Sequence, residues 1–175
     1  LEKIQSSNMK NNIPVKDNLV DLISKIGEKI TIRRAKFFDN KNGSNFHYVH
    51  NAVEKNIGKI ISVVKLSNNN KEMNQEIGTK LAMHIAASNP LSVDKNDLDK
   101  QILDKELEII KAELSNSGKK GDMIEKISKG KLNKFISDNT LVNQIWILDP
   151  KKKVSDILKS IKVLSFIRYK VGEGV

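Results

Sequence analysis

The chain has 175 residues, of which 38% are hydrophobic and 30% charged, a composition that fits a folded globular protein rather than a disordered tail. It contains no cysteine, which excludes disulfides, thiolate metal sites and a thiol nucleophile and suits a reducing compartment. The net charge of +10 is spread along the chain, and only three of the 31 basic residues are arginine, the side chain best suited to grip phosphates and base edges.

Localisation follows from what the chain lacks. No apolar run approaches the roughly 20 residues that a membrane span needs. No secretory signal opens the sequence. We therefore expect a cytoplasmic protein without membrane association. Because the first residue is Leu1 rather than methionine, we also expect a fragment of a longer protein.

The first part of the chain predicts a short helix and then a strand. Asp17 is placed to cap a helix whose apolar residues recur at helical spacing, and Gly27 is placed to end it. In the segment 28–38, EKITIRRAKFF, Ile30 and Ile32 alternate with polar residues, which predicts a strand.

Two more strands and a long helix are predicted next. The turn-rich stretch DNKNGSN leads into FHYVH at 46–50, and IGKIISVVKL at 57–66 is typical of a buried strand. Three strands in succession indicate an antiparallel meander. The helix that follows, from about 71 to 88, should end at Asn89-Pro90, because a residue before proline avoids the α region.

After Pro90 the pattern becomes that of two amphipathic helices around a glycine-containing turn, SNSGKKGD. The second helix begins at Asp122, which with Glu125 resembles a capping box. Apolar residues at heptad-like steps predict the seam of an antiparallel coiled-coil hairpin: Leu103, Leu107, Ile110 and Leu114 on the first helix, and Ile124, Ile127, Leu132 and Phe135 on the second.

The chain returns through TLVNQIWILDP, a short helix near 154–159 and a last strand, LSFIRYKVGEG. We therefore predict an α+β fold. It consists of an antiparallel sheet of three to four strands packed with helices, with the antiparallel helical hairpin inserted before the final strand.

No catalytic constellation can be assembled from these residues. His47 and His50 lie three apart on a predicted strand, so they point to opposite faces and cannot share a metal ion. The glycines form no phosphate-binding loop, and no nucleophile elbow is present. We expect no enzyme, no cofactor and no metal. A binding protein remains, with two alternatives: an oligomerisation module using the hairpin, or a basic ribosome- or RNA-binding domain. Aromatic residues, only 5% of the chain, are sparse for the latter.

Several blocks, in order and at matching spacing, resemble bacterial elongation factor Ts, the guanine-nucleotide exchange factor for elongation factor Tu. They are KIGEKITIRR (25–34), YVH (48–50), MHIAASNP (83–90), SGK (117–119), GKLNKF (130–135), LVNQIWILDP (141–150) and FIRYKVGEG (166–174). The resemblance implies two related α+β subdomains, with the hairpin inserted in the second. It therefore assigns 1–28 to a remnant of the preceding subdomain and a linker helix, 29–93 and 139–175 to the C-terminal core subdomain, and 94–138 to the hairpin.

The resemblance also implies which residues meet the partner, elongation factor Tu in its GDP-bound and nucleotide-free forms. Ile26 and Gly27 would touch its nucleotide-binding domain, and Tyr48 and His50 another domain. His84 is either a core histidine or a further contact, and core roles also remain open for Ile26 and His50. The hairpin's outer face could instead serve a homodimer, and no specific nucleic acid is expected.

Some family features are missing. The N-terminal three-helix module and the threonine-aspartate-phenylalanine segment that acts near the Mg²⁺ site do not occur, and Asn56 stands where the family has an arginine. We therefore expect partial exchange activity.

Overall fold

The computed structural model describes residues 1–67, 71–118 and 121–174, which divide into two compact units, Leu1–Asp39 and Asn40–Val175. The first unit contains helices α1 (Glu2–Gln5) and α2 (Val15–Ile26). Helix α2 ends where the sequence predicted, because Gly27 adopts a left-handed conformation with φ 73° and donates its N–H to Ile23 O at 2.9 Å. Its start differs from the prediction: Pro14 is the N-cap, so Asp17 lies in the first turn.

The strand predicted at 28–38 is wrong for this chain, since these residues belong to no strand. Alternating apolar residues mark a segment that is able to join a sheet, but a strand exists only where a neighbour supplies its hydrogen bonds.

The α+β fold class is confirmed, and the sheet in the described residues has three strands. Strands β1 (Gly43–Glu54), β2 (Ile57–Ser67) and β3 (Val163–Lys170) are antiparallel in the order β1-β2-β3. Strand β3, predicted from the C-terminal sequence, therefore takes the third place in the sheet. Strand β1 runs further at both ends than the predicted 46–50.

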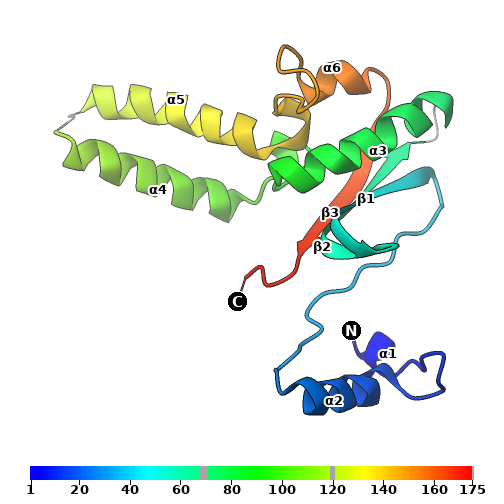
Figure 1. Cartoon of the computed structure of the whole chain (residues 1–175). Helices are drawn as coiled ribbons and strands as arrows, with labels where there is room; N and C mark the ends of the chain where they lie inside the picture. The colour runs from blue at the N-terminus through cyan, green and yellow to red at the C-terminus, as the bar shows by residue number, and fades with distance from the viewer. Residues whose placement is uncertain (68–70, 119–120, 175) are drawn as a thin grey trace. The chain divides into compact units, whose positions relative to one another are not determined.

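Helix α3 (Lys71–Ser88) lies across one face of the sheet, against β1 and β2 (Figure 1). Alternate residues of β2 point into this layer, so Val64 and Leu66 are fully buried together with Leu81 and Ile85 of α3. The core continues under helix α6 (Val154–Leu158). The aliphatic residues of these elements therefore form one continuous cluster beneath α3.

Helices α4 (Lys100–Asn116) and α5 (Asp122–Asn139) form the hairpin, which projects from the rest of its unit (Figure 1). A short 3₁₀ helix, η1 (Lys95–Asp97), precedes α4, and Gly121, not Asp122, is the N-cap of α5. Lys131 of α5 forms an ion pair with Glu113 of α4 at 3.0 Å.

The predicted seam residues differ in burial. Ile110 and Leu114 are buried, while Leu103, Leu107, Ile124, Ile127, Leu132 and Phe135 are half-buried. Ser128 and Ile136, which the heptad pattern did not include, are buried as well.

His84 joins three parts of the second unit. Its Nδ1 accepts the backbone N–H of Ile147 at 3.4 Å, so the proton of the neutral ring lies on Nε2, which donates to Gln144 Oε1 at 3.0 Å. Gln144 donates in turn to Asp138 O of α5 at 2.7 Å and to Ser88 O of α3 at 3.3 Å. Helix α3, the hairpin and the returning segment are thereby tied together.

Trp146 covers the other side of this network. Its ring stacks on that of His84, with the centroids 5.2 Å apart and the planes at 23°. His84 has no exposed surface, which favours the core interpretation over a direct contact with a partner.

The packing of Phe46 on Gly78 gives the first prediction. A Cβ at Gly78 would overlap the Phe46 ring, so Gly78→Ala should lower the free energy of unfolding by about 1–3 kcal/mol. Gly130 is the matched control, because it lies within α5 with nothing within 4 Å of an added Cβ. Gly130→Ala should raise the free energy of unfolding by about 0.5–1 kcal/mol in urea denaturation. Equal effects of the two changes would contradict the described packing.

The buried His84 gives the second prediction. Burial lowers the pKa of its imidazole below the ordinary 6.5, and the hydrogen bond to Gln144 only partly opposes this. The unfolded chain therefore binds a proton at a higher pH than the folded chain does. The contribution of the neutral His84 ring to the free energy of unfolding is complete above about pH 6.5. It is lost as the pH falls below that value, by at most about 1.4 kcal/mol per pH unit.

Urea unfolding at pH 7.5 and 5.5 measures this loss. His84→Gln should reduce the pH dependence, whereas Ile136→Val, which destabilises the hairpin without removing a titratable group, should keep it. A wild-type pH dependence in His84→Gln would show that other groups are responsible.

Candidate functional site

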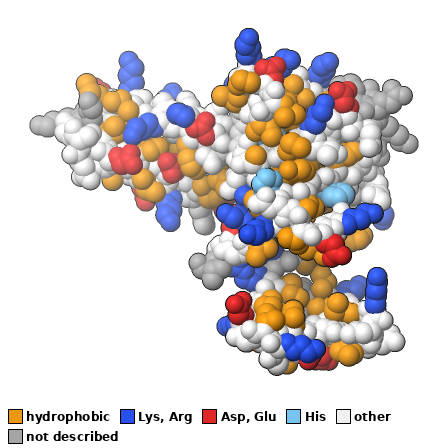
Figure 2. Space-filling view, viewed as in Figure 1, with side chains coloured by type: hydrophobic (Ala, Val, Ile, Leu, Met, Phe, Trp, Pro, Cys, Tyr) orange, Lys and Arg blue, Asp and Glu red, His pale blue; other side chains and the backbone are white. Residues whose placement is uncertain are grey.

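Tyr48 and His50, two residues apart on β1, point to the same face of the sheet. The Tyr48 hydroxyl and His50 Nδ1 are 3.2 Å apart, within hydrogen-bonding distance, and the two rings lie 6.0 Å apart between centroids. Figure 2 shows histidine side chains among hydrophobic ones on the visible surface of the larger unit. Tyr48 is half-buried and His50 is exposed, and a pair of amphipathic rings of this kind is typical of a protein contact surface.

The pair borders a pocket of about 450 Å³ between the sheet and the end of α3. Tyr48 pairs in register with Ser62, and Ser62 with Arg168, so Tyr48 and Arg168 lie in one row across the three strands. His50 pairs with Ile60 in the next row. The remaining lining residues are Met83, Ala86 and Ala87 of α3.

Arg168 forms the fixed polar wall of this pocket. Its side chain is only 10% exposed, its Nε donates to Ala86 O at 3.0 Å, and its Nη1 forms an ion pair with Glu173 at 2.8 Å. The guanidinium therefore holds the end of α3 to β3, and it places a permanent positive charge beside an apolar floor. The two small alanines leave that floor open.

Sequence reasoning placed Tyr48 and His50 on one strand but missed Met83 and Arg168, which meet them only through the register of the sheet. Met83 lies in the block MHIAASNP and Arg168 in the block FIRYKVGEG, and the family resemblance of these blocks was the signal that could have identified the two residues. His84, within the first of these blocks, lies in the core and does not line the pocket.

Ile26 and Gly27 belong to the unit Leu1–Asp39 and are described with it alone. Ile26, the last residue of α2, is 49% exposed, and the same helix exposes Val20 and Leu22. The α2 helix has no fully buried residue within its unit. An amphipathic helix in this state presents apolar side chains to solvent.

The described residues contain no cluster of three or more histidine, cysteine, aspartate or glutamate side chains able to hold a metal ion. Among the helices in the same part of the chain, none combines the length and the apolar character required to cross a membrane.

Comparison with known proteins supplies the family. The family model described as elongation factor TS matches residues 1–173. The elongation factor Ts of Rickettsia prowazekii is 32% identical to this chain, and those of Rickettsia felis and Rickettsia massiliae are 31% identical. Each alignment covers all of this chain but only 60% of the relative, so the chain spans three fifths of the length of these proteins. With nearly its whole length matched, the chain belongs to the elongation factor Ts family.

Proposed function

We propose that this chain binds elongation factor Tu in the cytoplasm and promotes the release of GDP from it, acting as part of a guanine-nucleotide exchange factor. The observation that carries the proposal is the pocket beside Tyr48 and His50, at the positions where the family resemblance implies a contact with Tu. Ile26 and Gly27 would supply a second contact, to the nucleotide-binding domain of the partner.

The pocket has the properties of a pre-organised protein-binding surface. Its walls come from three hydrogen-bonded strands and one helix, and Arg168 is already fixed by its two partners. A partner side chain entering it would therefore cost little ordering of this chain. An apolar floor beside the Arg168–Glu173 ion pair would accept an apolar side chain of the partner.

Exchange of this kind requires no catalytic side chain. A protein that binds nucleotide-free Tu more tightly than Tu·GDP lowers the affinity of Tu for GDP by the same factor. This follows because the effect of GDP on binding of the protein and the effect of the protein on binding of GDP are reciprocal. We propose partial activity for these 175 residues, because they correspond to 60% of the length of the relatives.

The oligomerisation alternative also has a supporting observation. Ile102 and Ile109 of α4, one heptad apart, are 38% and 46% exposed. A dimer through the hairpin would use these side chains rather than Leu107, which is half-buried in the described structure. Sedimentation of wild type and Ile109→Ser tests this. A concentration-dependent dimer lost in the variant would support it, and a monomer in both would reject it.

The third prediction tests binding to Tu. The labelled chain should bind nucleotide-free Tu more tightly than Tu·GDP at physiological salt. A saturating concentration of the chain should lower the affinity of Tu for GDP by the ratio of these two affinities. Ala87→Leu should fill the pocket and weaken binding by about tenfold or more, the loss expected when one well-packed contact is blocked. Fluorescence anisotropy measures the affinities, and release of a labelled GDP measures the exchange.

Ala112→Leu is the matched control, because Ala112 is an exposed alanine on α4, outside the pocket. It should leave Tu binding unchanged. Absence of wild-type binding at tens of micromolar chain would reject the proposed function. Normal binding by Ala87→Leu would instead remove the pocket from the interface.

A further inference from the structure

The segment Ile145–Lys153, between the 3₁₀ helix η2 (Leu141–Asn143) and α6, presents apolar side chains to solvent. Ile145 is 63% exposed, Leu148 53% and Ile147 39%, while Trp146 between them is 4% exposed. Isolated surface hydrophobics are ordinary, but three within four residues form a cluster. None of the three lines the Tyr48 pocket.

The loop is held in one conformation. Three backbone hydrogen bonds close the loop. The backbone N–H of Trp146 donates to Lys152 O at 2.8 Å, that of Asp149 to Trp146 O at 3.2 Å, and that of Lys152 to Asp149 O at 3.1 Å. An antiparallel bridge joins Ile145 to Lys153. Below the loop, the Trp146 ring stacks on His84. The exposed side chains are therefore displayed by a braced turn.

Asp149 braces the turn further. Its carboxylate accepts the backbone N–H of Lys151 at 3.1 Å and pairs with the Lys152 ammonium at 3.1 Å. The Lys151 N–H and then the Lys152 side chain lower the pKa of the Asp149 carboxyl below its ordinary value.

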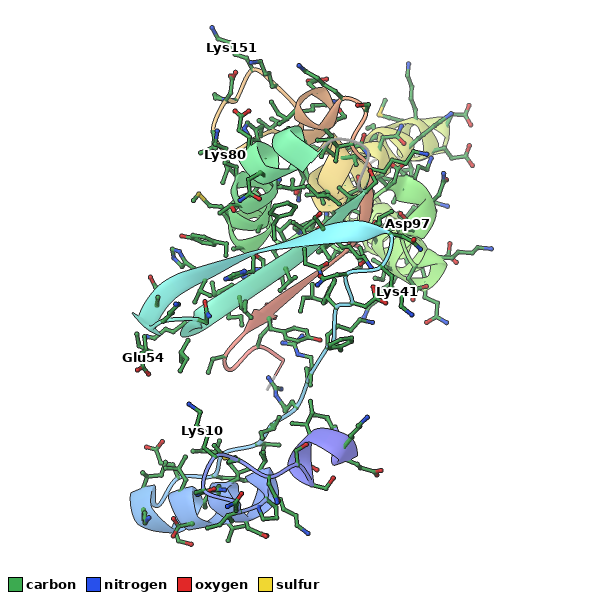
Figure 3. All side chains as sticks on the ribbon, turned by 90° about the vertical axis from the view of Figure 1, so that its right-hand side faces the viewer. Lys10, Lys41, Glu54, Lys80, Asp97 and Lys151 are labelled. Atoms are coloured by element: carbon green, nitrogen blue, oxygen red, sulfur yellow. The ribbon has the colours of Figure 1, made fainter. Side chains whose placement is uncertain are left out.

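The rim of the apolar cluster is basic. Lys151 and Lys153 are exposed and form no ion pair within residues 1–67, 71–118 and 121–174, whereas Lys152 is engaged by Asp149. In Figure 3 the Lys151 side chain points away from the rest of the chain. The bridge to Ile145 places Lys153 directly beside an exposed apolar residue.

We propose that the loop Ile145–Lys153 is a second docking surface, for an acidic amphipathic segment of a protein partner. The apolar side chains of that segment would cover Ile145, Ile147 and Leu148, and its carboxylates would meet Lys151 and Lys153. This arrangement has the apolar centre and polar rim of a protein–protein interface. It shares no residue with the pocket assigned to elongation factor Tu and does not depend on that assignment.

Charge and composition favour a protein over the other two classes of partner. An anionic membrane is recognised by clusters of about four to eight basic residues, and here three lysines share the surface with Asp149 and Asp156. Nucleic acid calls for arginines and exposed aromatic rings, and the one aromatic side chain of the loop, Trp146, is buried against His84.

The fourth prediction uses a synthetic amphipathic peptide of about 15 residues, the length at which an isolated helix is marginal in water, with leucine at every third or fourth position and glutamate elsewhere. It should shift the amide NMR signals of residues 145–153 in a saturable way. Ile145→Ser with Leu148→Ser should weaken binding by about tenfold through lost apolar burial. Lys151→Glu with Lys153→Glu should weaken it by about five- to tenfold, since two exposed charge pairs are reversed.

Leu164→Ser, which removes a 44% exposed leucine of β3 elsewhere on the unit, is the control and should bind the peptide like the wild type. Equal binding by the wild type and both loop variants would overturn the proposal. So would binding of phosphatidylserine vesicles in place of the peptide, or the absence of any binding. Loss of elongation factor Tu binding would not bear on this result, because the peptide is measured alone.

Discussion

The second unit depends on one buried polar interaction, between residues 60 positions apart in the chain, His84 and Gln144. A buried imidazole or carboxamide without a hydrogen-bond partner costs about 1–3 kcal/mol, so neither is tolerated alone in the core. Together they satisfy each other, and Gln144 also satisfies carbonyls at the ends of α3 and α5. The His84–Gln144 pair therefore avoids the cost of burying unsatisfied polar groups, and it also fixes where the hairpin joins the sheet layer.

Both candidate surfaces are consequences of that junction. On one side, the end of α3 is held so that the backbone carbonyl of Ala86 accepts a hydrogen bond from Arg168 and Ala86 lines the pocket. On the other side, Trp146 stacks on His84, so the residues flanking it have to face outward. A single buried histidine thereby positions two surfaces built from distant parts of the sequence.

Local patterns predicted much of this fold, and non-local pairing explains what they missed. The hairpin helices, strand β2 and the end of α3 before Pro90 each depend on residues close in sequence, and all are present. The segment 28–38 has the alternation of a strand but no strand partner, which no local pattern reveals. Arg168 joins Tyr48 only through two steps of strand register, so its place in the pocket could not be derived from spacing.

Under the proposed function, affinity and exchange are separate properties of this chain. A ligand that binds two states equally shifts nothing between them, however tightly it binds. The rigid pocket beside Tyr48 favours affinity, because it needs no rearrangement to receive a partner. Exchange needs in addition a contact that differs between GDP-bound and nucleotide-free Tu. We propose Ile26 and Gly27 in the other unit for this role, because the resemblance implies that they touch the nucleotide-binding domain of Tu. If that unit lost its contact, the chain would remain a binder of Tu and cease to be an exchange factor.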